Sequence, residues 1–121
     1  MDKKELVRLL ALEDFDPIYK EADQIRQRNV GDIVHIRAII EFSNICRRQC
    51  RYCGLNCSNT HVRRYRMSQE EILQTAHRAI DAGYKTIVLQ SGEDPGLQLQ
   101  EMGEIVKEIK QAGAAVTLSL G

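Results

Sequence analysis

The chain has 121 residues, of which 43% are hydrophobic and 28% charged, and its formal net charge is zero. This length suits one ordinary domain, and the composition is that of a globular protein and not of a disordered tail or a fibrous repeat. A neutral chain is no general polyanion binder, so any basic stretch within it needs a local explanation.

The N-terminal residues predict a short helical region. Leu6 and Leu10 repeat at helical spacing, and Asp16-Pro17 opens a second helix. Gly31 is expected to end this helix, because glycine readily adopts the left-handed conformation that closes helices. We therefore expect residues 1–31 to form a helical extension ahead of the main fold.

The N-terminus carries no sign of export. Residues 1–5 are mostly charged, and they are not followed by the unbroken apolar core of a secretory signal. No apolar run approaches the roughly 20 residues of a membrane span. We expect a cytoplasmic protein without a membrane partner, and in that reducing compartment clustered cysteines are more often metal ligands or redox groups than disulfides.

The middle of the chain predicts a strand, a long loop and a helix. Residues 33–42 are dense in isoleucine and valine with no turn residue, which is typical of a strand buried on both faces. The loop after this strand contains all four cysteines. Ser68 and Glu71 then predict the capping box of a helix, and Gly83 its end.

A second round of the same pattern follows. Residues 85–90 predict a strand, residues 91–96 a loop, and residues 115–120 a third strand. The helix between these strands is expected to place four apolar residues on one face: Leu99, Met102, Val106 and Ile109.

The alternation of strands and helices predicts an α/β fold with a parallel sheet. A complete (β/α) barrel needs about 250 residues. We therefore expect residues 32–121 to be the N-terminal part of a TIM-type barrel, with its first three parallel strands.

The four cysteines lie close together in a loop without acidic residues. Cys46, Cys50 and Cys53 have the spacing C-x3-C-x2-C, and Cys57 follows. Iron–sulfur clusters are held by closely spaced thiolates, and three thiolates for four irons leave one iron open to chemistry. Structural zinc remains an alternative, although cysteine zinc sites usually use two well-separated pairs.

The same region is rich in arginine, at Arg47, Arg48, Arg51, Arg63, Arg64 and Arg66. Nucleic acid is one possible partner of such a stretch. We favour two other interpretations, because the rest of the chain supplies no basic face. Guanidinium groups offset the negative charge of a cluster, and they offer a docking surface for an electron-donor protein.

The cysteine motif, with Tyr52 just before its last cysteine, resembles the signature of radical S-adenosylmethionine (SAM) enzymes. Four segments together are similar to the HydE family, radical SAM maturases of [FeFe]-hydrogenase: VHIRAIIEFSNICRRQCRYCGL, RYRMSQEEI, KTIVLQSGEDPG and AVTLSLG. Biotin synthase and methylornithine synthase are relatives in the same class, and they remain the alternative.

This resemblance implies that Cys46, Cys50 and Cys53 ligate a [4Fe-4S] cluster, and that SAM chelates its open iron. The reduced cluster would cleave SAM to methionine and a 5'-deoxyadenosyl radical that attacks a small-molecule or organometallic substrate. The implied partners are an electron-donor protein and other hydrogenase maturases. Cys57 lies outside the motif and is expected to be a spare thiol, with a substitute ligand as the alternative.

The resemblance also assigns residues around SAM. Ser91, Gly92 and Glu93 occupy the place of the Gly-Gly-Glu motif that meets the methionyl amino group. Glu93 can accept hydrogen bonds from an ammonium group, and Gly92 permits a close backbone approach. Tyr52 is expected to act through its backbone near adenine, with its ring packing beside the cluster. The alternatives are an ordinary turn at the first site and simple loop anchoring at Tyr52.

Two hydroxyl residues alternate along the third predicted strand. Thr117 and Ser119 share one face of it, at the end where barrel active sites lie. By resemblance, Ser119 would lie near SAM, and Thr117 near substrate together with Ser91. Hydroxyl groups satisfied by neighbouring backbone are the alternative.

Overall fold

The structure is a computed structural model that describes residues 2–120. Its residues form two compact units, one up to His35 and one from Ile36 onward. The first unit holds α1 (Lys3–Leu10) and α2 (Asp16–Val30). Gly31 follows α2 with φ at 72°, the left-handed conformation that glycine tolerates. The two helices expected from the sequence are thus confirmed.

The second unit is a three-stranded parallel sheet with two helices, as predicted. Its elements are β1 (Ala38–Ser43), α3 (Gln69–Asp81), β2 (Thr86–Ser91), α4 (Leu99–Gln111) and β3 (Ala115–Ser119). The strands lie in chain order, β1-β2-β3. Ile40 pairs with Leu89, and Leu89 with Leu118, so each face of the sheet runs continuously across the strands.

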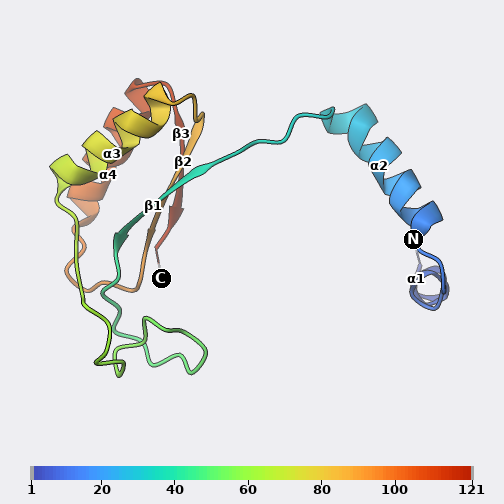
Figure 1. The fold of residues 1–121 in the computed structure, drawn as a ribbon, viewed down its shortest axis with the longest axis horizontal. Helices are drawn as coiled ribbons and strands as arrows, with labels where there is room; N and C mark the ends of the chain where they lie inside the picture. Colours follow the sequence, from blue (N-terminus) through green and yellow to red (C-terminus); the bar gives the residue numbers. More distant parts are fainter. Residues whose placement is uncertain (1, 121) are drawn as a thin grey trace. The chain divides into compact units, whose positions relative to one another are not determined.

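Both helices cover the same face of the sheet (Figure 1). Crossovers between parallel strands are right-handed, so a sheet whose strands follow in chain order receives every helix on one side. That arrangement is the one found in (β/α) barrels. The core lies between this face and the helices, and its largest fully buried apolar side chains are Phe42, Ile87, Leu89, Ile105 and Ile109.

The opposite face of the sheet is uncovered within residues 36–120. Ile39 is 60% exposed there, and Glu41, Thr117 and Ser119 are exposed as well. The prediction of a first strand buried on both faces is therefore wrong. Burial of both faces needs a second layer, and α3 and α4 supply only one.

Two local expectations also change. The first strand begins at Ala38, because β1 pairs with β2 only from Ala38 onward, and the apolar residues before it, such as Val34, are exposed. Leu99 is 84% exposed, and Ile105 lies in the core with Met102. Helical periodicity predicts which side of the helix a residue lies on. It does not predict how far along the helix the neighbouring elements extend to cover that side.

The start of α3 agrees with its prediction. The Glu71 N–H donates to the Ser68 hydroxyl at 3.2 Å, and the Ser68 N–H donates to the Glu71 carboxylate at 2.7 Å. Gly83, with φ at 97°, follows the helix. No helix within residues 2–120 is long and apolar enough to cross a membrane.

The chain between β1 and α3, residues 44–68, is the cysteine loop. In Figure 1 it extends, in green, from the edge of the sheet at which β2 also ends. The fold therefore places the cysteines at the carboxyl edge of the strands, where parallel α/β proteins carry their sites.

Candidate functional site

The cysteine loop contacts the segment that follows β2, residues 92–98, called here the β2 loop. The Arg47 N–H donates to the Glu93 carbonyl at 3.0 Å, and the Gly92 N–H donates to the Ser43 carbonyl at 3.3 Å. These backbone bonds join the ends of two neighbouring strands. The predicted Ser-Gly-Glu motif and the first predicted cluster ligand are thereby brought together.

Gly92 lies against Cys46. A Cβ on Gly92 would be 2.5 Å from the Ile45 carbonyl oxygen and 2.7 Å from the Cys46 Cβ, closer than side chains pack. Any residue other than glycine would therefore push the two loops apart. The structure thus shows a close approach of Gly92 to the cysteine loop, and its expected approach to SAM stays a prediction.

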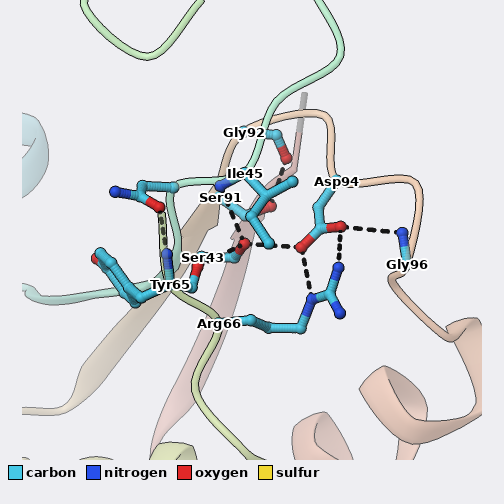
Figure 2. Close-up of polar contacts among 9 residues, drawn as sticks. Ser43, Ile45, Tyr65, Arg66, Ser91, Gly92, Asp94 and Gly96 are labelled. Atoms are coloured by element: carbon cyan, nitrogen blue, oxygen red, sulfur yellow. Dashed lines mark hydrogen bonds and ion pairs between the residues drawn. The ribbon is translucent and has the colours of Figure 1, made fainter. Parts of the chain in front are cut away.

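A buried carboxylate ties the same two loops together (Figure 2). The Ser43 hydroxyl donates to Asp94 Oδ2 at 2.7 Å, and Arg66 Nε donates to the same oxygen at 2.7 Å. A second guanidinium nitrogen of Arg66 and the Gly96 N–H bind Asp94 Oδ1. The Asp94 side chain is fully buried, and its partners come from β1, the cysteine loop and the β2 loop.

These contacts keep Asp94 ionised. The hydrogen bond from Arg66, helped by those from Ser43 and Gly96 and opposed by burial, lowers the pKa of Asp94 to about 2. The role of Asp94 is not predicted from the sequence, in which this residue lies in an expected loop, and Arg66 is predicted only as part of the surroundings of a cluster. One feature of the sequence could have indicated this residue: Asp94 opens an Asp-Pro-Gly turn in the loop that follows a predicted strand.

Glu93 is held between two arginines of the cysteine loop. Arg48 Nε lies 2.5 Å from Glu93 Oε1, and Arg47 Nε lies 3.2 Å from Oε2. The pKa of Glu93 is below its usual value, first because of the hydrogen bond from Arg48 and also because of Arg47. Its side chain is only 18% exposed, so this carboxylate lies partly buried between two guanidinium groups.

The cysteines are all free thiols. Cys46, Cys50 and Cys53 are half-buried, whereas Cys57 is exposed. The Cys53 N–H donates to the Cys50 carbonyl at 3.2 Å, which places these two residues in one turn. Tyr52, between them, is 92% exposed. Within residues 2–120 no three His, Cys, Asp or Glu side chains are gathered closely enough to hold a metal as they stand.

The predicted hydroxyl residues lie on the uncovered side of the sheet and at its edge. In the sheet register Thr117 pairs with Val88, and Ser119 with Gln90; both hydroxyl residues are exposed. The Ser91 hydroxyl donates to the Gly92 carbonyl at 2.8 Å. A hydroxyl group that binds the neighbouring backbone in this way is the alternative predicted for Ser91 from the sequence.

An iron–sulfur cluster fits this loop by the chemistry of its donors. Three half-buried thiols lie on one loop, and the loop contains no carboxylate. The Arg48 backbone N–H donates to Cys46 Sγ at 3.5 Å, so this arginine lies next to the first of the three thiols. The pKa of its guanidinium is raised, first by Glu93. A cation in that position offsets the negative charge that thiolates bring to a cluster.

Comparison with known proteins agrees with this site. Residues 40–120, more than half of the chain, match the Radical SAM superfamily. This chain belongs to that superfamily. The [FeFe] hydrogenase maturase subunit HydE of Thermotoga maritima is 58% identical to it over 106 residues, covering 88% of this chain and 30% of that protein.

Two further relatives are methylornithine synthases. The 3-methylornithine synthase of Methanosarcina acetivorans is 33% identical, over 99% of this chain and 35% of that protein. The crystal structure of methylornithine synthase (PylB) superposes with a TM-score of 0.82 at 31% identity, over 98% of this chain and 36% of the other. The expected part of a radical SAM (β/α) barrel is thereby confirmed.

The chain spans about a third of the length of these radical SAM relatives. Membership of the superfamily implies a [4Fe-4S] cluster and SAM as cofactors. The matched range contains the whole cysteine loop, the β2 loop and β3, so every residue singled out around the candidate site lies within the family match.

Proposed function

We propose that this chain is part of a radical SAM enzyme of the HydE type, which acts in the maturation of the [FeFe]-hydrogenase active-site cluster. The 58% identity to HydE carries the proposal, because 3-methylornithine synthase, from the same superfamily, reaches only 33%. The proposed substrate is a small molecule or an organometallic precursor of that cluster.

Cys46, Cys50 and Cys53 are the proposed ligands of a [4Fe-4S] cluster. A cluster held by these three thiolates would supply the electron for reductive cleavage of SAM to methionine and a 5'-deoxyadenosyl radical, the species that would attack the substrate. The half-burial of the three thiols supports this assignment. The exposed Cys57 is proposed to have no part in it.

Glu93 is the proposed acceptor for the ammonium group of SAM. It follows Gly92, which lies against Cys46, and it binds two guanidinium groups, Arg47 and Arg48, so its carboxylate suits a cation. An arriving ammonium would take over part of the hydrogen bonding that these arginines now supply. The Gly92 backbone allows the β2 loop to stay close to the cysteine loop while this happens.

The remaining assignments rest on position. Ser119 and the backbone of Tyr52 are proposed to contact SAM, and Ser91 and Thr117 the substrate. The uncovered face of the sheet carries Thr117 and Ser119, so a molecule bound inside a barrel would meet their exposed side chains. No side chain is assigned a role in hydrogen transfer.

The proposed organisation has residues 1–31 as a helical extension and residues 32–121 as part of the barrel. A cytoplasmic location is proposed, because a reducing compartment keeps the four cysteines as thiols. The proposed partners are an electron-donor protein and other hydrogenase maturases. No membrane or nucleic-acid partner is proposed, and two of the loop arginines, Arg47 and Arg48, bind Glu93 within the chain.

Anaerobic reconstitution with iron and sulfide of the full-length protein that contains this chain tests the enzyme class. We expect a brown protein whose reduced EPR signal changes when SAM is added, and which forms 5'-deoxyadenosine with dithionite. Stoichiometric zinc with no such signal would contradict the proposal. The HydE type is tested by restoring hydrogenase activity in cells that lack HydE, with Cys50→Ala as the control that should not restore it.

A further inference from the structure

One arginine binds the backbone on both sides of the cysteine motif. Arg64 Nη1 donates to the Asn44 carbonyl at 2.7 Å and to the Leu55 carbonyl at 2.9 Å. Its Nη2 donates to the Asn56 carbonyl at 2.7 Å and to the Asn59 carbonyl at 3.3 Å. The Arg64 side chain is half-buried, and it satisfies four carbonyls that belong to no helix or strand.

These carbonyls bracket the predicted ligands. Asn44 precedes Cys46 by two residues, and Leu55 follows Cys53 by two residues. A loop without regular secondary structure takes its shape from such bonds, since its backbone groups otherwise need water or each other. One side chain therefore sets the separation between the two ends of the motif.

Arg64 is itself held in place by the end of β1. The Asn44 side chain donates to the Arg63 carbonyl at 2.9 Å, and its oxygen accepts from the Tyr65 N–H at 2.8 Å. The Tyr65 hydroxyl donates to the Glu41 carbonyl at 2.7 Å. The residues on both sides of Arg64 are thus attached to the strand from which the cysteine loop departs.

We propose that Arg64 is a positioning residue, which holds the cysteine loop in the shape that Cys46, Cys50 and Cys53 need to take up their cluster. The inference rests on the proposed function and extends it to a residue outside the cysteine motif. A planar guanidinium fork reaches four carbonyls at once, whereas the compact lysine ammonium carries three donors at a single point. Lysine at this position therefore keeps the charge but not the bonding pattern.

The test compares Arg64→Lys with Arg63→Lys, which makes the same change at an exposed neighbour. In the reduced protein without iron, Arg64→Lys should raise the rates at which Cys46 and Cys53 are alkylated several-fold. After anaerobic reconstitution its iron and sulfide content should fall to less than half. The remaining EPR signal should broaden and respond weakly to SAM, while Arg63→Lys matches the wild type.

The outcomes separate this inference from the proposed function. If the wild type forms no cluster, the proposed function is wrong. If the wild type forms one and Arg64→Lys has the same cluster content, EPR signal and thiol reactivity, only the inference is wrong. Loss of the sheet in Arg64→Lys, measured by circular dichroism, would also overturn it, because the inference assigns Arg64 to the loop and not to the core.

Discussion

Gly92 and Cys46 lie in backbone contact across the ends of β2 and β1. A Cβ added to Gly92 would be 3.2 Å from the Cys46 Cα and closer still to its Cβ. The position of the first proposed cluster ligand therefore depends on a glycine that is far away in the sequence and binds no metal.

Gly92→Ala should displace Cys46 and weaken the fold. The added methyl group meets backbone atoms, which cannot rotate away as a flexible side chain would, and overpacking of this kind costs about 1–3 kcal/mol. We expect a lower unfolding midpoint and less iron per chain after reconstitution. Gly103→Ala is the matched control, since a Cβ there meets nothing within 4 Å and α4 should gain slightly in stability.

Asp94→Asn should remove part of the pH dependence of stability. The pKa of Asp94 is lowered to about 2 by Arg66, Ser43 and Gly96. Because the pKa of Asp94 is lower in the folded state than its usual value of 3.8, its ionised form stabilises the fold at pH values above 3.8. This stabilisation is lost as the pH falls through about 2. Urea unfolding should show the wild-type advantage over Asp94→Asn shrinking by about 2 kcal/mol between about pH 5 and pH 2.

Asp81→Asn serves as the control for that measurement, because Asp81 is exposed at the end of α3. The difference in free energy of unfolding between Asp81→Asn and the wild type should change much less over the same pH range. If the difference in free energy of unfolding between the wild type and Asp94→Asn stays constant with pH, the buried ion pair of Asp94 with Arg66 is contradicted.

In the full-length protein, replacing Cys46, Cys50 or Cys53 by alanine should abolish SAM cleavage, because each removal leaves too few thiolates for the cluster. Cys57→Ala should leave it largely intact. Cys57 is exposed, and its N–H, which donates to the Arg48 carbonyl at 2.8 Å, is kept by alanine. The measurement is 5'-deoxyadenosine formed per chain with dithionite. Equal loss at Cys57 would contradict the three-ligand assignment.

Glu93→Gln should weaken SAM binding to the reconstituted protein. Hydrogen bonds to charged groups contribute about 1.5–3 kcal/mol, so the loss of the carboxylate charge should raise the Kd of SAM about tenfold or more. Calorimetric titration with SAM measures this, and Glu104→Gln on the exposed side of α4 is the control. An unchanged Kd would remove Glu93 from the proposed SAM site.

The parts of the fold that were predicted well depend on neighbours in sequence. Ser68 and Glu71 lie three residues apart, and their reciprocal bonds form as expected. The first strand begins later than the sequence predicts. A run of isoleucine and valine becomes a strand only where another strand pairs with it. β2 pairs with β1 from Ala38 onward.

The candidate site divides in the same way. The cysteine motif and the Ser-Gly-Glu segment could be found from residue type and spacing, and the structure places both at the carboxyl edge of the sheet. Asp94 could not be found in this way, because it lies 51 residues from Ser43 and 28 from Arg66, the side chains that bind it.

The sequence by itself determined the order of the elements, the ends of the helices and the spacing of three thiols. Capping, turn formation and ligand spacing act within a few residues, so they can be interpreted in a short window. Only the tertiary structure decided which face of the sheet the helices cover, that Gly92 lies against Cys46, and that Arg64 spans the cysteine motif. Burial and hydrogen bonding across loops depend on distances in space, which sequence separation does not determine.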